Sequence, residues 1–153
     1  MAEPRELLRM LVVWGARLVV AGTFTIAAIP KVDDLAGFAQ DIRNYQWFPD
    51  WSLHGLAAVV PMVELVGAAA VLSGRERWVR AGGLMLGILT VAFVALIGSV
   101  IARGIDLDCG CFGKQAEAEA VGWPTLLRDL GLLGAIGVAM FRVRRVPGPA
   151  PGD

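Results

Sequence analysis

Four apolar stretches, each about as long as a bilayer is thick, alternate with shorter polar segments along this chain of 153 residues. About 20 residues of α-helix cross a hydrocarbon core of roughly 30 Å. Each stretch therefore predicts a membrane-spanning helix, at residues 10–29, 53–72, 81–101 and 123–141. The predicted fold is all-α, an integral membrane four-helix bundle over residues 10–141. Residues 1–9 form a polar N-terminus, and the Pro/Gly-rich residues 142–153 predict a disordered tail.

The polar segment between the first two stretches is amphipathic. Leu35, Phe38 and Ile42 recur at helical spacing among charged residues, which predicts a short helix along the membrane interface. The aromatic residues that follow are typical of a headgroup belt: Tyr45, Trp47 and Trp51. The same aromatic side chains are also candidates for the wall of a quinone or partner site.

The third stretch carries a small-xxx-small pattern, Gly83 to Gly87, which lets membrane helices approach closely. The pattern predicts that this face of the helix packs against a neighbour.

Positive charges predict the orientation of the bundle. Eight Lys and Arg residues lie in residues 1–9, 73–80 and 142–153, whereas four lie in the two remaining connections. Lys and Arg are enriched on the cytoplasmic side, so both termini are predicted to be cytoplasmic in a multi-pass protein of the cell's inner membrane. The connection between the third and fourth stretches is then extracytoplasmic.

That connection contains both cysteines of the chain, as Cys109-Gly110-Cys111. A disulfide between residues two apart requires a bent backbone, which glycine permits. Such a bridge closes almost no loop and constrains the unfolded chain little, so a structural role is disfavoured. A redox pair is the leading interpretation, because disulfides are exchanged outside the cytoplasm. Metal binding and an ordinary loop remain alternatives.

Two ionisable residues lie inside the first two apolar stretches. Arg17 and Glu64 each lie about 10–12 Å from the predicted cytoplasmic face at a rise of 1.5 Å per residue. Because an unpaired charge in a bilayer is costly, we expect them to form an intramembrane ion pair. Alternatively, Glu64 carries a proton or anchors a polar head group.

A second charged pair, Arg128 and Asp129, lies one turn into the fourth stretch. An arginine near a cysteine favours the reactive thiolate, so Arg128 is a candidate supporting residue for the cysteines. The alternative is that it extends to the lipid headgroups.

The composition of the chain gives little indication of a metal, a nucleic acid or a cofactor as a partner. His54, the single histidine, is a weak third soft ligand beside Cys109 and Cys111, so no metal site is predicted beyond that alternative. The formal net charge is zero, which gives no indication of a nucleic-acid partner. No motif identifies a cofactor, and quinone use has no motif behind it.

Several motifs together resemble one family. They are Pro30-Lys31-Val32-Asp33, Asn44-Tyr45, Pro61-x-x-Glu64-x-x-Gly67, Cys109-Gly110-Cys111-Phe112-Gly113, and Trp123 followed by Arg128. In these motifs the chain is similar to MauE proteins of methylamine utilisation, which resemble the DoxX group of four-span proteins. Asp129 departs from the family's pattern, which usually has asparagine after the arginine of the fourth span.

The resemblance implies a function outside the cytoplasm. It implies a helper in the maturation of disulfide-containing periplasmic proteins such as methylamine dehydrogenase, together with a thioredoxin-like partner. It adds Phe112 and Gly113 to the cysteine motif, and makes Lys31, Asn44 and Tyr45 candidates for a pocket at the outer face. We therefore carry two hypotheses: a thiol-disulfide oxidoreductase that uses Cys109 and Cys111, and a non-enzymatic assembly factor or soft-metal handler. Whether the protein is an enzyme is left open at this stage.

Overall fold

The computed structural model describes residues 4–103 and 123–141, and all regular secondary structure in these ranges is helical. The helices are α1 (Pro4–Asp33), α2 (Leu35–Asn44), α3 (Asp50–Leu72), α4 (Glu76–Arg103) and α5 (Trp123–Ala139). The all-α prediction is thus confirmed for the described residues. Cys109, Gly110, Cys111, Phe112 and Gly113 lie outside them, as does the predicted tail.

Three of the helices, α1, α3 and α4, are long and apolar enough to cross a membrane. Large apolar side chains cover their outer surfaces: Leu18, Ile26, Val59 and Ile88 are all more than half exposed. This is the arrangement of a multi-pass membrane protein, whose outward side chains meet lipid. The helix α5 has 17 residues, fewer than the roughly 20 that span a bilayer, so the fourth span and the orientation of the termini stay predictions.

The helices α1, α3 and α4 are longer than the apolar stretches that predicted them. The helix α1 begins at Pro4 and continues through Pro30 to Asp33, and α4 extends from Glu76 to Arg103. Charged residues at a membrane interface do not interrupt helical hydrogen bonding, so the backbone stays helical past the end of the apolar run. As a result, Lys31 belongs to α1 rather than to the following loop.

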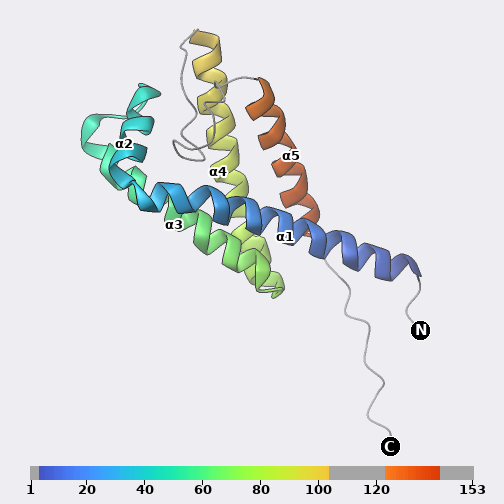
Figure 1. The fold of residues 1–153 in the computed structure, drawn as a ribbon. Helices are drawn as coiled ribbons and strands as arrows, with labels where there is room; N and C mark the ends of the chain where they lie inside the picture. Colours follow the sequence, from blue (N-terminus) through green and yellow to red (C-terminus); the bar gives the residue numbers. More distant parts are fainter. Residues whose placement is uncertain (1–3, 104–122, 142–153) are drawn as a thin grey trace, which may run out of the picture.

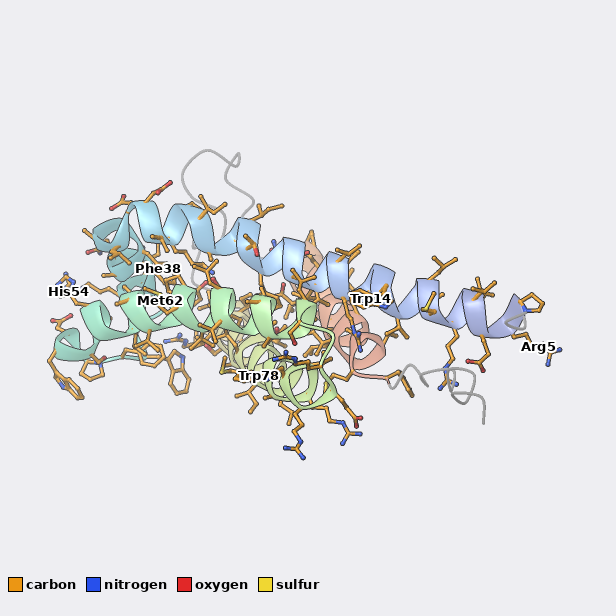
Figure 2. The ribbon with its side chains drawn as sticks, turned by 90° about the horizontal axis from the view of Figure 1, so that it is seen from below. Arg5, Trp14, Phe38, His54, Met62 and Trp78 are labelled. Carbon is orange, nitrogen blue, oxygen red and sulfur yellow. The ribbon has the colours of Figure 1, made fainter. Side chains whose placement is uncertain are left out.

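Each of α1, α3, α4 and α5 packs against two of the other three. The helix α1 contacts α3 and α5, and α4 contacts the same two helices (Figure 1). Figure 1 shows α4 and α5 standing steeply across α1, and Figure 2 shows α3 running alongside α1. The apolar core between them includes Val20, Phe24, Val71, Leu86 and Ile136.

The helix α2 confirms that the segment around Leu35, Phe38 and Ile42 is helical, and its place along the membrane interface stays a prediction. Its N-cap is Asp34, whose Oδ1 accepts a hydrogen bond from the backbone N–H of Gly37 at 2.8 Å. Phe38 and Ile42 pack with Leu53 of α3 in a second apolar cluster. The apolar face of the amphipathic helix α2 is therefore directed at α3.

The connection after α2 is tied to the last turn of α4. The guanidinium of Arg103 donates to the Tyr45 carbonyl at 2.8 Å and lies 5.8 Å from the ring centroid of Trp47. The indole N–H of Trp47 donates to Ser99 Oγ at 2.9 Å. These contacts fix the end of α4 from which residues 104–122 lead to α5.

Candidate functional site

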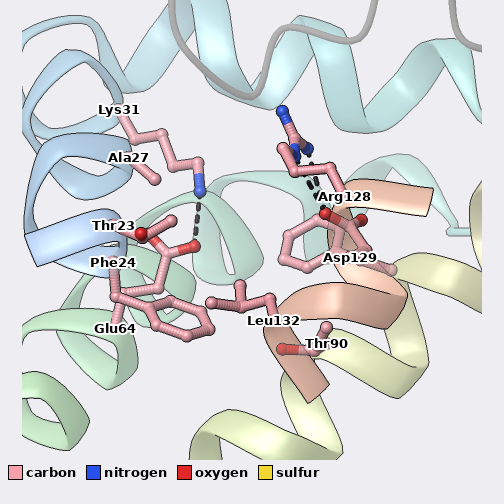
Figure 3. A pocket seen from close by; sticks show the side chains of 10 residues that line it. Thr23, Phe24, Ala27, Lys31, Glu64, Thr90, Arg128, Asp129 and Leu132 are labelled. Carbon is pink, nitrogen blue, oxygen red and sulfur yellow. Dashed lines mark hydrogen bonds and ion pairs between the residues drawn. The ribbon is translucent and has the colours of Figure 1, made fainter. Parts of the chain in front are cut away.

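A small charged cavity lies where the four long helices meet (Figure 3). Its volume is about 40 Å³. The lining residues are Thr23, Phe24, Ala27 and Lys31 of α1, Glu64 of α3, Thr90 and Phe93 of α4, and Arg128, Asp129 and Leu132 of α5. Charged residues so far inside an apolar bundle are expensive and usually functional, which makes this cavity the candidate site.

One wall of the cavity is an ion pair between α1 and α3. Lys31 Nζ donates to Glu64 Oε1 at 2.5 Å, and the two side chains are only 3% and 2% exposed. The ammonium also lies 5.4 Å from the ring centroids of Phe38 and Phe93. A desolvated cation gains from the faces of aromatic rings. Lys31 is therefore held by one carboxylate and two rings.

The predicted pairing of Arg17 with Glu64 is wrong. Arg17 instead donates from Nε to the Ala139 carbonyl at 3.1 Å, at the end of α5, and its guanidinium lies 5.2 Å from the Trp14 ring centroid. The prediction used depth alone, but residues at equal depth can lie on different faces of their helices. The side chain of Lys31 reaches Glu64 because side chains on a helix lean toward its N-terminus, in this case toward the bundle interior.

The opposite wall carries the pair predicted near the start of α5. Nε and Nη2 of Arg128 both lie 3.1 Å from Asp129 Oδ1. Asp129 is buried at 6% exposure, whereas the Arg128 side chain is 37% exposed. Figure 3 shows this pair across the cavity from Lys31 and Glu64. The predicted effect of Arg128 on the cysteines falls outside the described residues.

The other candidate residues do not join this site. Asn44 Oδ1 accepts from Gln40 Nε2 at 3.5 Å on α2, and Tyr45 is buried with its carbonyl bound to Arg103. Neither lines the cavity that contains Lys31. His54 is exposed near the start of α3. The outer-face pocket suggested for Lys31, Asn44 and Tyr45 is therefore not this cavity.

Sequence reasoning did not identify Thr23, Thr90 or Phe93 as site residues. A threonine within an apolar stretch has no distinctive spacing, since its hydroxyl can bond to its own helix. Thr23 and Thr90 do so, donating to the carbonyls of Val19 and Leu86 at 2.8 Å. Their position at the cavity depends on helix packing, which the sequence pattern does not specify.

Comparison with known proteins gives one family. The chain matches the family of the methylamine utilisation protein MauE over residues 9–142. It is 30% identical to methylamine utilization protein MauE of Paracoccus denitrificans over 88% of this chain and 70% of that protein. It is 34% identical to the protein of that name from Methylorubrum extorquens, over 80% of this chain and 66% of that protein. No solved structure matches the chain.

The matched region includes the four long helices, the charged cavity and the cysteine motif. The identity is moderate but extends over most of the chain in each relative. The chain belongs to the MauE family.

Proposed function

We propose that this protein supports methylamine utilisation by thiol-disulfide exchange on the extracytoplasmic side of the cell membrane. Cys109 and Cys111 carry the exchange, and the client is a disulfide-containing extracytoplasmic protein of the methylamine dehydrogenase type. The observation that carries the proposal is the family match over residues 9–142, which includes the only two cysteines of the chain. The relatives are named for methylamine utilisation.

The arrangement of the helices supports this assignment. Residues 104–122 join the C-terminal end of α4 to the N-terminal end of α5. The Lys and Arg distribution assigns that connection to the extracytoplasmic side, where disulfides persist. Arg128 follows within two turns of the start of α5 and would favour a thiolate nearby.

The chemistry is a two-electron exchange. When the Cys109–Cys111 disulfide oxidises a client, a client thiolate attacks one sulfur and forms a mixed disulfide. The second client thiolate then releases the protein as a dithiol and leaves the client with a disulfide. A lipid-soluble carrier of the quinone class would reoxidise the dithiol by accepting two electrons and two protons. Exchange in the opposite direction reverses the same steps.

Cysteine substitution in cells tests the proposal. The double variant Cys109→Ser with Cys111→Ser should abolish formation of the client's disulfides. Alkylation of the client's free thiols with a mass tag measures this loss. One of the two single variants should accumulate a mixed disulfide that is visible without reductant and lost with it. Ser52→Ala, on α3, leaves both cysteines in place and is the control for expression and insertion.

The alternative is a non-enzymatic assembly factor. It predicts that the client still acquires its disulfides in the double variant and that Cys109 and Cys111 stay reduced in an oxidising buffer. Full client maturation in the double variant would therefore overturn the exchange proposal. Metal analysis of the purified protein distinguishes a soft-metal handler, which should contain bound metal, from an assembly factor that binds none.

A further inference from the structure

The polar atoms that line the charged cavity have more acceptor than donor capacity. Oε2 of Glu64 has no hydrogen-bond partner among the described residues, although the side chain is 2% exposed. Thr23 and Thr90 donate their hydroxyl hydrogens to carbonyls of their own helices. A hydroxyl whose hydrogen is used in this way offers only lone pairs to other groups. Three lining residues therefore present acceptors.

Burial makes this imbalance costly. A buried polar atom without a partner loses its hydration and gains nothing in return. The Lys31 ammonium donates to Glu64 Oε1 and the Arg128 guanidinium donates to Asp129 Oδ1, and neither bond involves Glu64 Oε2. No group among the described residues donates to Glu64 Oε2, so a small molecule bound in the cavity is one way to supply that donor.

Size and charge identify the class of donor. A water molecule needs about 10–15 Å³ of such a cavity, so a volume of about 40 Å³ accommodates a few water molecules. The pairs Lys31–Glu64 and Arg128–Asp129 each cancel in formal charge. A cation would add an unbalanced charge beside the Lys31 ammonium, where the repulsion is weakly screened. A small neutral donor fits better than an ion.

We propose that the cavity is an internal water-binding site whose water molecules donate to Glu64 Oε2, Thr23 and Thr90 and link the two ion pairs into one hydrogen-bonded network. Water molecules in this position provide a route for a proton between Glu64 and Asp129. The proposal does not depend on cysteine chemistry.

Arg128 controls entry to this site. It is the most exposed of the residues that line the cavity, whereas Lys31, Glu64, Thr90 and Asp129 are buried. Its pairing with Asp129 holds the guanidinium at the cavity wall. Water therefore enters beside Arg128, and shortening this side chain should open the path.

Radiolytic footprinting of the purified full-length protein tests the proposal. Hydroxyl radicals generated from bound water oxidise the side chains beside it, and mass spectrometry locates the products. Phe24 and Phe93 line the cavity. Phe38 is as buried as Phe24 but does not line it, so it is the internal control. We expect Phe24 to be labelled well above Phe38.

Two variants connect the labelling to the lining atoms. Thr23→Val with Thr90→Val keeps the shape of the cavity but removes two acceptors, and should lower Phe24 labelling about fivefold. Thr25→Val lies on α1 outside the cavity lining and should leave the labelling unchanged. With a pulse of ¹⁸O-water, Arg128→Ala should incorporate the isotope at Phe24 faster than the wild type, and Arg128→Lys less so.

Two results would overturn the water site, and a third would overturn the role of Arg128 as its entry point. Labelling of Phe24 at the level of Phe38 would mean that the cavity is dry. An equal loss in the Thr25→Val and double-valine variants would mean that the threonine hydroxyls are not the binding groups. Unchanged isotope incorporation in Arg128→Ala would remove Arg128 as the entry point. Normal client maturation in the double-valine variant leaves the water site intact, because the two proposals have separate measurements.

Discussion

The interior of this protein is packed in two opposite ways, by close backbone contact between α3 and α4 and by buried charge around the cavity. At Gly82 of α4, a Cβ atom would lie 2.8 Å from the Gly67 carbonyl oxygen and 2.7 Å from Ala70 Cβ. No larger side chain fits there without moving the backbone. Such close approach of small residues is what holds helices together in lipid, where apolar burial gives little driving force.

The cavity lacks this kind of packing. Lys31, Glu64 and Asp129 are each less than a tenth exposed, and desolvating their charges opposes folding. An apolar cluster of equal volume would hold the same helices without that penalty. The contrast separates the α3–α4 contact, which favours association of the helices, from a charged cavity whose desolvation does not.

The largest effect should come from leaving one buried charge without its partner. Glu64→Leu removes the carboxylate and leaves the Lys31 ammonium buried between two rings. We expect a loss of about 3–5 kcal/mol in the free energy of unfolding, the range for breaking a buried ion pair. Lys31→Met should do the same by isolating Glu64. Unfolding of the purified protein in mixed detergent micelles measures the difference.

The double variant sharpens this test. Lys31→Met with Glu64→Leu leaves neither charge buried, so it should be far more stable than either single variant and close to the wild type. Stability near that of the single variants would show that the pair contributes net stability, and would weaken its assignment to function.

A smaller loss is expected where the backbones of α3 and α4 touch. Gly82→Val places two methyl groups against the Gly67 carbonyl, so the helices must separate. Overpacking of this kind costs about 1–3 kcal/mol. Gly87→Val is the matched control on the same helix, because a Cβ there meets nothing within 4 Å. The same micelle measurement should show little change for Gly87→Val, and equal losses at both positions would mean that helix propensity, not contact, is responsible.

These two glycines also show how far the sequence could predict the fold. The Gly83 to Gly87 pattern predicted a packing face, and a Cβ on Gly83 would lie 2.7 Å from Met140 Cγ, whereas a Cβ on Gly87 meets nothing within 4 Å and Gly82 makes the close backbone contact. A regular spacing identifies a face that can pack, but not which face a neighbour covers. Apolar length, by contrast, predicted the spans of α1, α3 and α4, because a bilayer sets that length whatever the packing.

The candidate site was predicted only in part for the same reason. Glu64 and Asp129 were identified because charges are rare in apolar stretches. The partner of Glu64 was not, since Lys31 lies beyond Pro30 and was assigned to a pocket at the outer face instead. Its role depends on α1 remaining helical to Asp33, which turns the side chain back toward α3. The cysteine motif lies outside the described residues, so its geometry stays a prediction.

The smallest effect should come from Arg17, the buried cation outside the cavity. It donates to the Ala139 carbonyl at the end of α5 and has no carboxylate partner among the described residues. Arg17→Leu therefore leaves no opposite charge without its partner. The free energy of unfolding should fall by about 1 kcal/mol, the value of one intramolecular hydrogen bond. Arg17→Lys should fall between Arg17→Leu and the wild type, because it keeps the charge near the helix C-terminus but loses the planar group over Trp14. If Arg17→Leu proved as destabilising as Glu64→Leu, buried charge would be stabilising in both regions, and charge alone would no longer mark the cavity as the functional one.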